Sequence, residues 1–196
     1  MKKFFLLLAM VATITTYAQV SFGVKAGVNW ANERIVNSGL VFLPTTLTSF
    51  HGGVYMVAKF GKFGIQPEIV YSRVGGVYDN YFFTGSIITD YFTIPVLLNY
   101  SISKKVTLQL GPQLGVLNMA KQTIDGATTD TQYKYKTGDF GVAFGFNVKL
   151  PHRLNVGVRY IAGLRDINSG NVGASGSATT NHVIQLSVGY RLFGKE

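Results

Sequence analysis

Two segments near opposite ends of the chain alternate between apolar and polar residues with a period of two. In residues 22–30 every even position is apolar, whereas the odd positions hold glycine, lysine or asparagine. Residues 184–192 repeat the pattern, with glutamine, serine, glycine and arginine between the apolar positions. A period of two predicts β-strands with one apolar and one polar face. Because the polar face is small and rich in glycine, it favours a narrow polar interior and an apolar exterior that faces lipid.

The composition agrees with strands in a membrane. Hydrophobic residues make up 47% of the chain and charged residues only 14%, whereas an ordinary soluble domain has about 25% charged residues. Beyond the N-terminus, no apolar run approaches the roughly 20 residues that a membrane helix needs. The 23 glycines also disfavour a helical protein. Apolar residues dispersed by alternation explain all three observations.

The N-terminus has the pattern of a cleaved export signal. Two lysines precede an apolar run at residues 4–14, and Thr16 and Ala18 supply the small residues of a cleavage site. We therefore expect residues 1–18 to be a signal peptide and residues 19–196 to form one barrel domain. A membrane anchor is disfavoured because the apolar run is too short.

The charge and the absence of cysteine exclude several classes of function. The net charge is +9, but the positive residues are dispersed and the protein is expected to be exported, so we do not expect a nucleic-acid partner. Many of them lie near expected short turns, where they are either solvated or meet anionic lipid head groups. Without cysteine or a histidine pair at ligand spacing, no metal site is expected. No motif for a cofactor is present.

Turn signals divide the rest of the chain into eight expected strands. They lie at residues 21–30, 50–60, 63–74, 87–102, 105–118, 137–150, 153–165 and 181–193. The connections alternate between long and short, as in outer-membrane barrels with short periplasmic turns and longer outer loops. The sequence therefore predicts an all-β fold, an eight-stranded antiparallel up-and-down transmembrane β-barrel in the outer membrane.

The long connections and three prolines give more detailed expectations. The outer loops are expected at residues 31–48, 75–86, 119–136 and 166–180. The first of them is unusually apolar, so it either folds over the barrel mouth, extends the strands or contacts a protein. Pro67, Pro95 and Pro112 lie within expected strands and each removes a ladder donor. We expect bulges there or shifted strand boundaries.

The polar face defines a candidate site inside the barrel. An eight-stranded barrel has an interior just wide enough for its side chains. Alternation places Lys25, Glu68, Asp139, Arg159 and Arg191 in this lumen, where we expect a structural polar network. An ion-pair cluster centred on Glu68, with Lys25 and Arg159 at similar heights, is the favoured arrangement, and a proton or ion relay is the alternative. Replacement of Glu68 by alanine should then destabilise the barrel.

Several stretches in order along the chain resemble the PorT-like outer-membrane β-barrel proteins. They are residues 23–29 (GVKAGVN), 66–72 (QPEIVYS), 91–98 (YFTIPVLL), 111–115 (GPQLG), 159–160 (RY), 163–167 (GLRDI) and 188–193 (VGYRLF). The resemblance covers the mature chain. It implies an OmpA-like eight-stranded barrel in the outer membrane of a Gram-negative cell, inserted by machinery that reads an aromatic residue near the C-terminus. It implies no single activity and transfers no catalytic residues.

The sequence favours a structural or binding role through the outer loops, with outer-membrane lipids around the barrel, a possible protein partner at the loops, and neither catalysis nor a cofactor. A narrow pore or a component of a transport or secretion assembly is the first alternative. A lipid-acting enzyme is the second: His51 and His182 are expected at the outer rim, and His182 could meet Ser175 or Ser177 near Asp166. A soluble ligand-binding barrel would require the large apolar residues to point inward.

Overall fold

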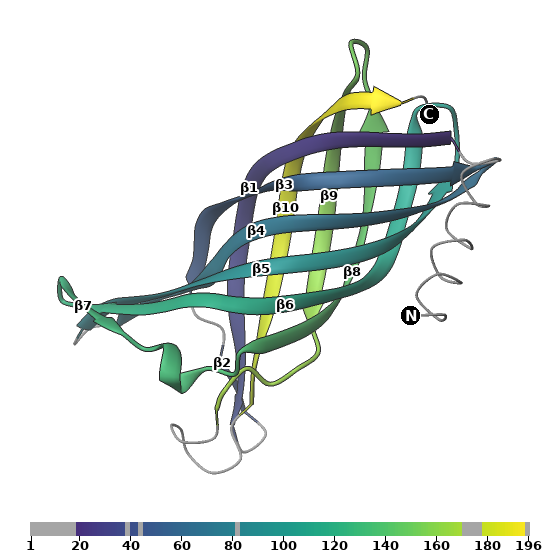
Figure 1. Ribbon diagram of the computed structural model, residues 1–196. Coiled ribbons are helices and arrows are strands. Elements are labelled where there is room, and N and C mark those ends of the chain that lie inside the picture. Colours follow the sequence, from purple (N-terminus) through teal and green to yellow (C-terminus); the bar gives the residue numbers. More distant parts are fainter. Residues whose placement is uncertain (1–18, 38–39, 43–44, 81–82, 170–177, 195–196) are drawn as a thin grey trace, which may run out of the picture.

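The computed structural model describes residues 19–37, 40–42, 45–80, 83–169 and 178–194, most of which form strands (Figure 1). The long strands are β1 (Gln19–Asn37), β3 (Thr45–Phe60), β4 (Phe63–Asn80), β5 (Phe83–Ser101), β6 (Val106–Ile124), β8 (Gly138–Lys149), β9 (Leu154–Gly163) and β10 (Ala178–Gly194). Two short strands, β2 (Leu40–Phe42) and β7 (Ala127–Asp130), pair with β1 and β6, and a 3-10 turn, η1, spans Gln132–Lys134. Within the described residues, no helix has the length and apolarity to cross a membrane.

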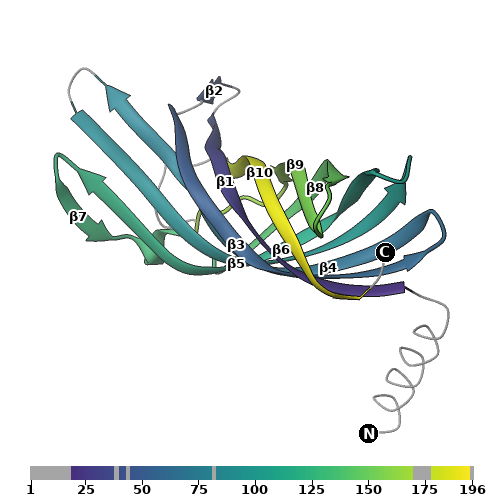
Figure 2. The same cartoon turned by 90° about the horizontal axis from the view of Figure 1, so that it is seen from above.

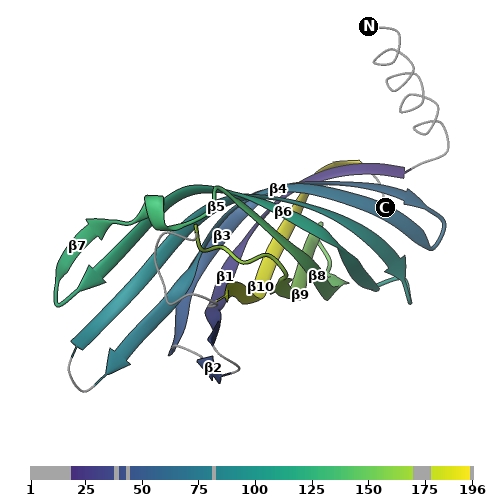
Figure 3. The ribbon, with the colours of Figure 1, turned by 90° about the horizontal axis from the view of Figure 1, so that it is seen from below.

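The eight long strands form a closed ring. Each pairs antiparallel with the next long strand along the chain, and β10 pairs with β1. Closure satisfies the backbone donors and acceptors between neighbouring strands, as a hydrocarbon environment demands. Figure 3 shows the strands side by side around the ring. The prediction of an all-β, eight-stranded antiparallel up-and-down barrel is confirmed.

The apolar faces of the strands point outward. Val24, Phe144 and Leu186 expose 40%, 57% and 37% of their surface, whereas their neighbours Lys25 and Gln185 are buried. Outward aromatic residues gather at two levels: Trp30, Phe50, Tyr71, Phe92, Phe140 and Tyr160 at the outer one, and Phe22, Phe63, Tyr100, Tyr190 and Phe193 near the short turns. Amphipathic rings at two levels suit the two water–lipid boundaries. This orientation argues against a soluble barrel with a dry interior.

Three strands continue far beyond the outer aromatic level. Strand β4 runs on from Tyr71 to Asn80, which is roughly 30 Å at about 3.3 Å per residue. Strands β5, β6 and β7 extend beside it, and Figure 2 shows this wall reaching beyond β8 and β9. The regions 75–86 and 119–136, expected to be loops, are therefore largely strand. Hairpin pairing satisfies their backbone groups better than irregular loops would.

The other expected loops are also shorter than the sequence indicates, because strands occupy part of them. Within 31–48, β1 continues to Asn37 and β3 already begins at Thr45, so the described part extends the strands. Within 166–180, strand β10 begins at Ala178, and residues 170–177 lie outside the described part of the chain.

The prolines do not produce the expected bulges. Strand register shifts occur at residues 22–23, 46–51 and 90–91, none of which includes a proline. Pro67 pairs with Val96, Pro95 with Gln113 and Pro112 with Val142. Two ladder pairs are missing directly after Pro67 and Pro95, but the register on either side of each gap is the same. A missing donor at these positions removes a hydrogen bond but does not require an extra residue in the strand, so the bulge prediction is wrong.

Polar side chains line the lumen along most of its length, and an apolar layer lies among them towards the outer end. This layer consists of the buried residues Val70, Val74, Tyr91, Leu117, Ile161 and Val183. Strict alternation did not predict this layer, because Val70, Leu117 and Ile161 follow outward apolar residues and both faces of the strand are then apolar. At Gly27, a Cβ atom would overlap the backbone oxygen of Leu186 and the ring of His51, so this close approach of β1 and β10 requires glycine.

Candidate functional site

A buried ion cluster lies in the middle of the lumen. Lys25 donates from Nζ to Oε2 of Glu68 at 3.0 Å. Arg159 forms a two-pronged pair, from Nη1 to Oε2 and from Nη2 to Oε1 of Glu68, both at 2.9 Å. The Glu68 side chain is fully buried, and those of Lys25 and Arg159 are 7% and 5% exposed. Strands β1, β4 and β9 supply these side chains from different parts of the wall.

Amide side chains continue the cluster across the barrel. Gln66 donates from Nε2 to Oε1 of Glu68 at 2.7 Å, and its own Oε1 accepts from Asn99 at 2.7 Å and from Gln109 at 3.0 Å. Gln109 in turn accepts from Nη2 of Arg159 at 3.0 Å. The closed circuit joins β4, β5, β6 and β9, so side chains from facing strands meet at this height and fill the lumen.

Asp139 and Arg191 lie away from this cluster. Asp139 pairs in the ladder with Gly115 towards the outer end, and its Oδ2 accepts from Asn181 at 3.0 Å. Arg191 lies near the short turns, where it lines a small hollow together with Arg153. The sequence placed all five residues in one network, whereas the structure brings three of them together. Alternation predicts which face of a strand a residue occupies, but it does not predict the position of that residue along the barrel axis.

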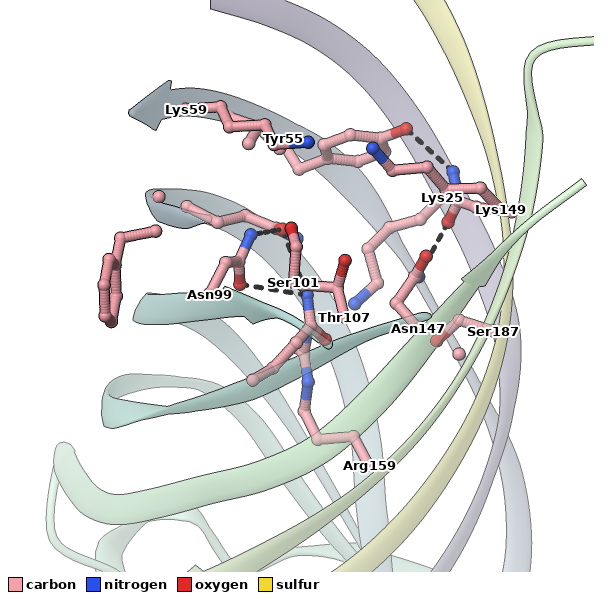
Figure 4. A pocket seen from close by; sticks show the side chains of 17 residues that line it. Lys25, Tyr55, Lys59, Asn99, Ser101, Thr107, Asn147, Lys149, Arg159 and Ser187 are labelled. Atoms are coloured by element: carbon pink, nitrogen blue, oxygen red, sulfur yellow. Dashed lines mark hydrogen bonds between the residues drawn. The ribbon is translucent and has the colours of Figure 1, made fainter. Parts of the chain in front are cut away.

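Two hollows lie on opposite sides of the ion cluster. The larger has a volume of about 50 Å³ and reaches from the cluster to the short turns. Figure 4 shows Lys25, Lys59, Lys149 and Arg159 around it, together with uncharged polar side chains. The smaller, of about 20 Å³, lies towards the outer end beside Tyr91. The apolar residues Val74, Tyr91, Ile161 and Val183 line the smaller hollow, and the ion cluster lies between it and the short turns.

A second polar group inside the lumen corrects the expected position of His51. His51 is 1% exposed. It lies well within β3 and not at the outer rim, because this strand begins at Thr45, six residues before it. Its Nδ1 contacts Oδ1 of Asn29 at 2.7 Å, and its Nε2 contacts Oγ of Ser187 at 2.8 Å. All three residues occupy positions that the two-residue alternation assigns to the inner face, so the sequence contained a signal that could have identified this group.

Within the described residues, the geometry does not assemble the lipid-acting enzyme site that the sequence left open. His182 contacts the hydroxyl groups of Tyr160 at 2.7 Å and Thr180 at 3.2 Å, while Ser175 and Ser177 lie outside the described residues. The Ser187–His51–Asn29 chain has the order of a nucleophile, a base and an orienting group. However, it faces the lumen and not the lipid boundary. Among the described residues, no group of three potential metal ligands is found.

Asp166 joins three segments at the outer end of the barrel. Among the described residues, no histidine forms a hydrogen bond with it. Its Oδ1 accepts from the amides of Thr179 at 2.9 Å and Asn168 at 3.2 Å, and its Oδ2 accepts from Lys136 at 2.9 Å. Burial tends to raise the pKa of the Asp166 carboxyl, but the Thr179 amide and the Lys136 ammonium outweigh it and hold this pKa below its ordinary value. The residue therefore fastens the outer segments to the start of β10.

The fold resembles solved bacterial surface proteins. Ail, the attachment invasion locus protein of Yersinia pestis, aligns with 89% of this chain and 99% of its own, with 14% identity and a TM-score of 0.50. Neisserial surface protein A aligns with 88% of this chain and 97% of its own, with 14% identity and a TM-score of 0.51. Such low identities establish similarity of fold alone. Among curated proteins, no significant match is found.

A family model connects this fold to a cellular location. The model described as "Outer membrane protein beta-barrel domain" matches residues 13–169, which is most of the chain. The match includes the strands that supply Lys25, Glu68 and Arg159. The chain therefore belongs to the outer membrane protein beta-barrel domain family and is an eight-stranded barrel of the outer membrane.

Proposed function

We propose that this protein is a closed outer-membrane barrel with a structural and binding role, exerted by the wall of β4, β5, β6 and β7 and without catalysis. The observation that carries the proposal is the length of the wall. A tilted membrane strand needs about 9–11 residues, whereas β4 has 18 and β5 and β6 have 19 each. The additional length serves no need of the lipid bilayer and builds a sheet in the surrounding water.

The end of the wall has features of a protein-binding edge. Strand β7 pairs with β6 on one side only among the described strands, and all four of its residues are exposed. An exposed strand edge can accept a strand from another protein through main-chain hydrogen bonds. We therefore place the possible protein partner at this edge, with outer-membrane lipids around the aromatic levels below it.

The filled lumen supports a binding role over a pore. The ion cluster and its amide partners join side chains from facing strands at the inner end of the larger hollow, and apolar side chains line the smaller hollow beyond it. A narrow pore or a transport component would need a continuous water path at this height. The fold of surface proteins such as Ail and Neisserial surface protein A is compatible with a role at the cell surface, although their identities of 14% do not transfer a ligand.

Two further expectations belong to this proposal. Residues 1–18 act as a cleaved signal peptide and residues 19–196 form the barrel domain, although the signal lies outside the described residues. The chain is inserted by the outer-membrane insertion machinery and is related to the PorT-like proteins, as its motifs indicate. Mass spectrometry of the exported protein tests the first expectation, because its N-terminal residue should be Gln19.

Site-specific photo-crosslinking on living cells tests the binding role. A photoreactive amino acid at Thr128 in β7 should give a discrete adduct with an extracellular or outer-membrane protein. The matched control carries the same group at Lys104 in a short turn on the opposite side of the membrane. Removal of residues 123–129 should abolish any capture by a second probe at Asp130 while the barrel still folds. Diffuse labelling of equal yield at Thr128 and Lys104 would contradict the proposal.

A further inference from the structure

One exposed cation lies on the lipid-facing side of the two strands that close the ring. Strands β1 and β10 pair along most of their length, and Figure 1 shows them side by side. Arg34 of β1 is exposed, whereas its neighbour Glu33 is 2% exposed and belongs to the lumen face. Arg34 therefore continues the outward row of β1, four residues beyond Trp30 of the outer aromatic level. Four residues span about 13 Å along a strand, or roughly 10 Å along the membrane normal at a tilt of about 40°. This distance puts the long Arg34 side chain within reach of lipid head groups.

A hydroxyl group stands directly beside Arg34 and is held in place by a histidine. Thr180 on β10 is the ladder partner of Arg34, and its Oγ1 lies 3.2 Å from Nε2 of His182. The Nδ1 of His182 lies 2.7 Å from the hydroxyl of Tyr160, and the two rings stack with centroids 6.0 Å apart. The shorter distance is typical of an O–H donor and the longer one of an N–H donor. We therefore assign Tyr160 as the donor to Nδ1 and Nε2 as the donor to Thr180, which leaves the Thr180 hydroxyl proton to donate to a group next to Arg34.

The charge of Arg34 is not balanced on this side of the barrel. Strands β1, β3, β9 and β10 contain a single carboxylate, Glu33, which faces the lumen. In the connection between β9 and β10, Asp166 is bound by Lys136 at 2.9 Å. None of the ion pairs among the described residues involves Arg34. The stretches next to these strands that the structure does not describe, residues 38–39, 43–44 and 170–177, contain no charged residue in the sequence. A positive charge of this kind at the membrane surface attracts anionic head groups.

The surface between Arg34 and the membrane centre is apolar. Trp30, Ile184 and Tyr160 lie opposite one another on β1, β10 and β9 and expose 39%, 46% and 43% of their surface. The next row towards the membrane centre consists of Val28, Leu186 and Val158. A cation and a hydroxyl donor therefore stand above a continuous apolar strip. This arrangement fits an amphiphile with a phosphorylated head group and acyl chains.

We propose that this lipid-facing surface of β1, β10 and β9 binds a phosphorylated glycolipid of the outer leaflet. Arg34 and Thr180 hold its phosphate, and the strip below them receives its acyl chains. The planar guanidinium group can donate two parallel hydrogen bonds to one phosphate, and the neighbouring hydroxyl can add a third. The position beyond the outer aromatic level selects a lipid of the outer leaflet, where the phosphorylated lipids of outer membranes are glycolipids. The site rests on the lipid contact of the proposed function and is independent of a protein partner at β7.

Fluorescence of the single tryptophan tests the site directly. The exported protein is purified from the outer membrane and reconstituted into vesicles of brominated phosphatidylcholine, whose chains quench Trp30 because its ring faces lipid. A lipid that occupies the site displaces brominated chains and restores the fluorescence. Diphosphorylated lipid A should do so at a mole fraction about tenfold lower than the same lipid after removal of its phosphates, as expected for charge-assisted hydrogen bonds. Equal potency of the two forms would overturn the proposal, and equal potency of phosphatidylglycerol would overturn the assignment to a glycolipid.

Three variants separate this site from the general charge of the surface. Arg34→Gln should remove the preference for the phosphorylated form, and the isosteric Thr180→Val should lower it by about threefold. The matched control is Lys62→Gln, which removes an exposed cation beside the exposed ring of Phe63 at the other lipid boundary and should change the preference by less than about twofold. All three should unfold at the original midpoint in phosphatidylcholine vesicles without lipid A, because the changed groups lie outside the lumen network. An unchanged preference in Arg34→Gln, or an equal loss in Lys62→Gln, would refute the site. Crosslinking from Thr128 should be unaffected by Arg34→Gln, so this result does not depend on the test of the outer wall.

Discussion

Replacement of Glu68 by glutamine should strongly destabilise the barrel. The side chain keeps its shape, but two buried cations lose their common counter-ion. Glu68 accepts four hydrogen bonds: one from Lys25, two from Arg159 and one from Gln66. Three of them come from charged donors, which are worth roughly 1.5–3 kcal/mol each, and the glutamine oxygen retains part of them. Loss of one partner from a buried ion pair typically costs about 3–5 kcal/mol, which is the decrease in free energy of unfolding that we expect.

The single tryptophan gives a direct assay for this prediction. Trp30 lies at the outer aromatic level, 39% exposed, so its fluorescence reports transfer from lipid to water during urea unfolding in vesicles. The control combines Glu68→Gln with Lys25→Met and Arg159→Met, which removes the stranded charges and should restore most of the stability. An unchanged unfolding midpoint in the single variant would refute the reasoning, because it would mean that Lys25 and Arg159 reach water without Glu68.

Four further outcomes follow from the geometry. In planar bilayers the barrel should give flat current traces, and stepwise conductance would contradict the filled lumen. A fluorophosphonate probe should not label Ser187, because the serine faces the lumen; stoichiometric labelling would revive an enzymatic role. Gly27→Ala should prevent folding or lower the unfolding midpoint strongly, whereas Gly52→Ala, whose Cβ would meet nothing closer than 3.8 Å, should be tolerated; electrophoretic heat-modifiability distinguishes them. Since the pKa of Asp166 is lowered in the folded protein, its stabilising contribution is complete above about pH 4 and is lost as the pH falls through the lowered value. The amide resonance of Thr179 should follow that titration and lose it in Asp166→Asn.

Alternation along the strands was sufficient to predict the barrel and its orientation. The pattern at residues 22–30 reappears as outward Val24 and Trp30 with inward Lys25 and Asn29. In a membrane barrel, every second side chain of a strand faces lipid and is apolar, whereas those between face the lumen. The period of two therefore predicts both the strands and their orientation. The parity of Lys25, Glu68 and Arg159 also placed them in the lumen, and strand pairing then brought them to one height.

The parts that the sequence did not predict depend on cross-strand geometry. Whether Asp139 reaches Glu68 depends on the tilt and register of strands distant in sequence, which no local pattern specifies. The same holds for the Ser187–His51–Asn29 group, which joins the first two long strands to the last one. The apolar inner layer was missed for a different reason. Where Val70 stands between Ile69 and Tyr71, both faces are apolar and the period of two disappears.

The wall was missed because leaving the membrane removes the signal that revealed the strands. On β5, outward Phe92 is followed two residues further out by Asp90, which binds Arg73 at 2.7 Å and the Tyr71 hydroxyl at 2.6 Å. Arg73 also lies over the ring of Phe50, with its guanidinium carbon 5.2 Å from the ring centroid. The rings of Tyr71 and Phe92 therefore lie at the outer lipid–water boundary, and the two-pronged Arg73–Asp90 ion pair lies two residues further out along each strand. Just beyond it, Val74 and Ala120 are still buried in the apolar cluster of the lumen. Further out, all four residues of β7 are exposed, so polarity no longer alternates there, and hairpin pairing with β6 maintains the strand. A sequence pattern that depends on lipid can therefore locate where the membrane ends, but it cannot tell how far the sheet continues.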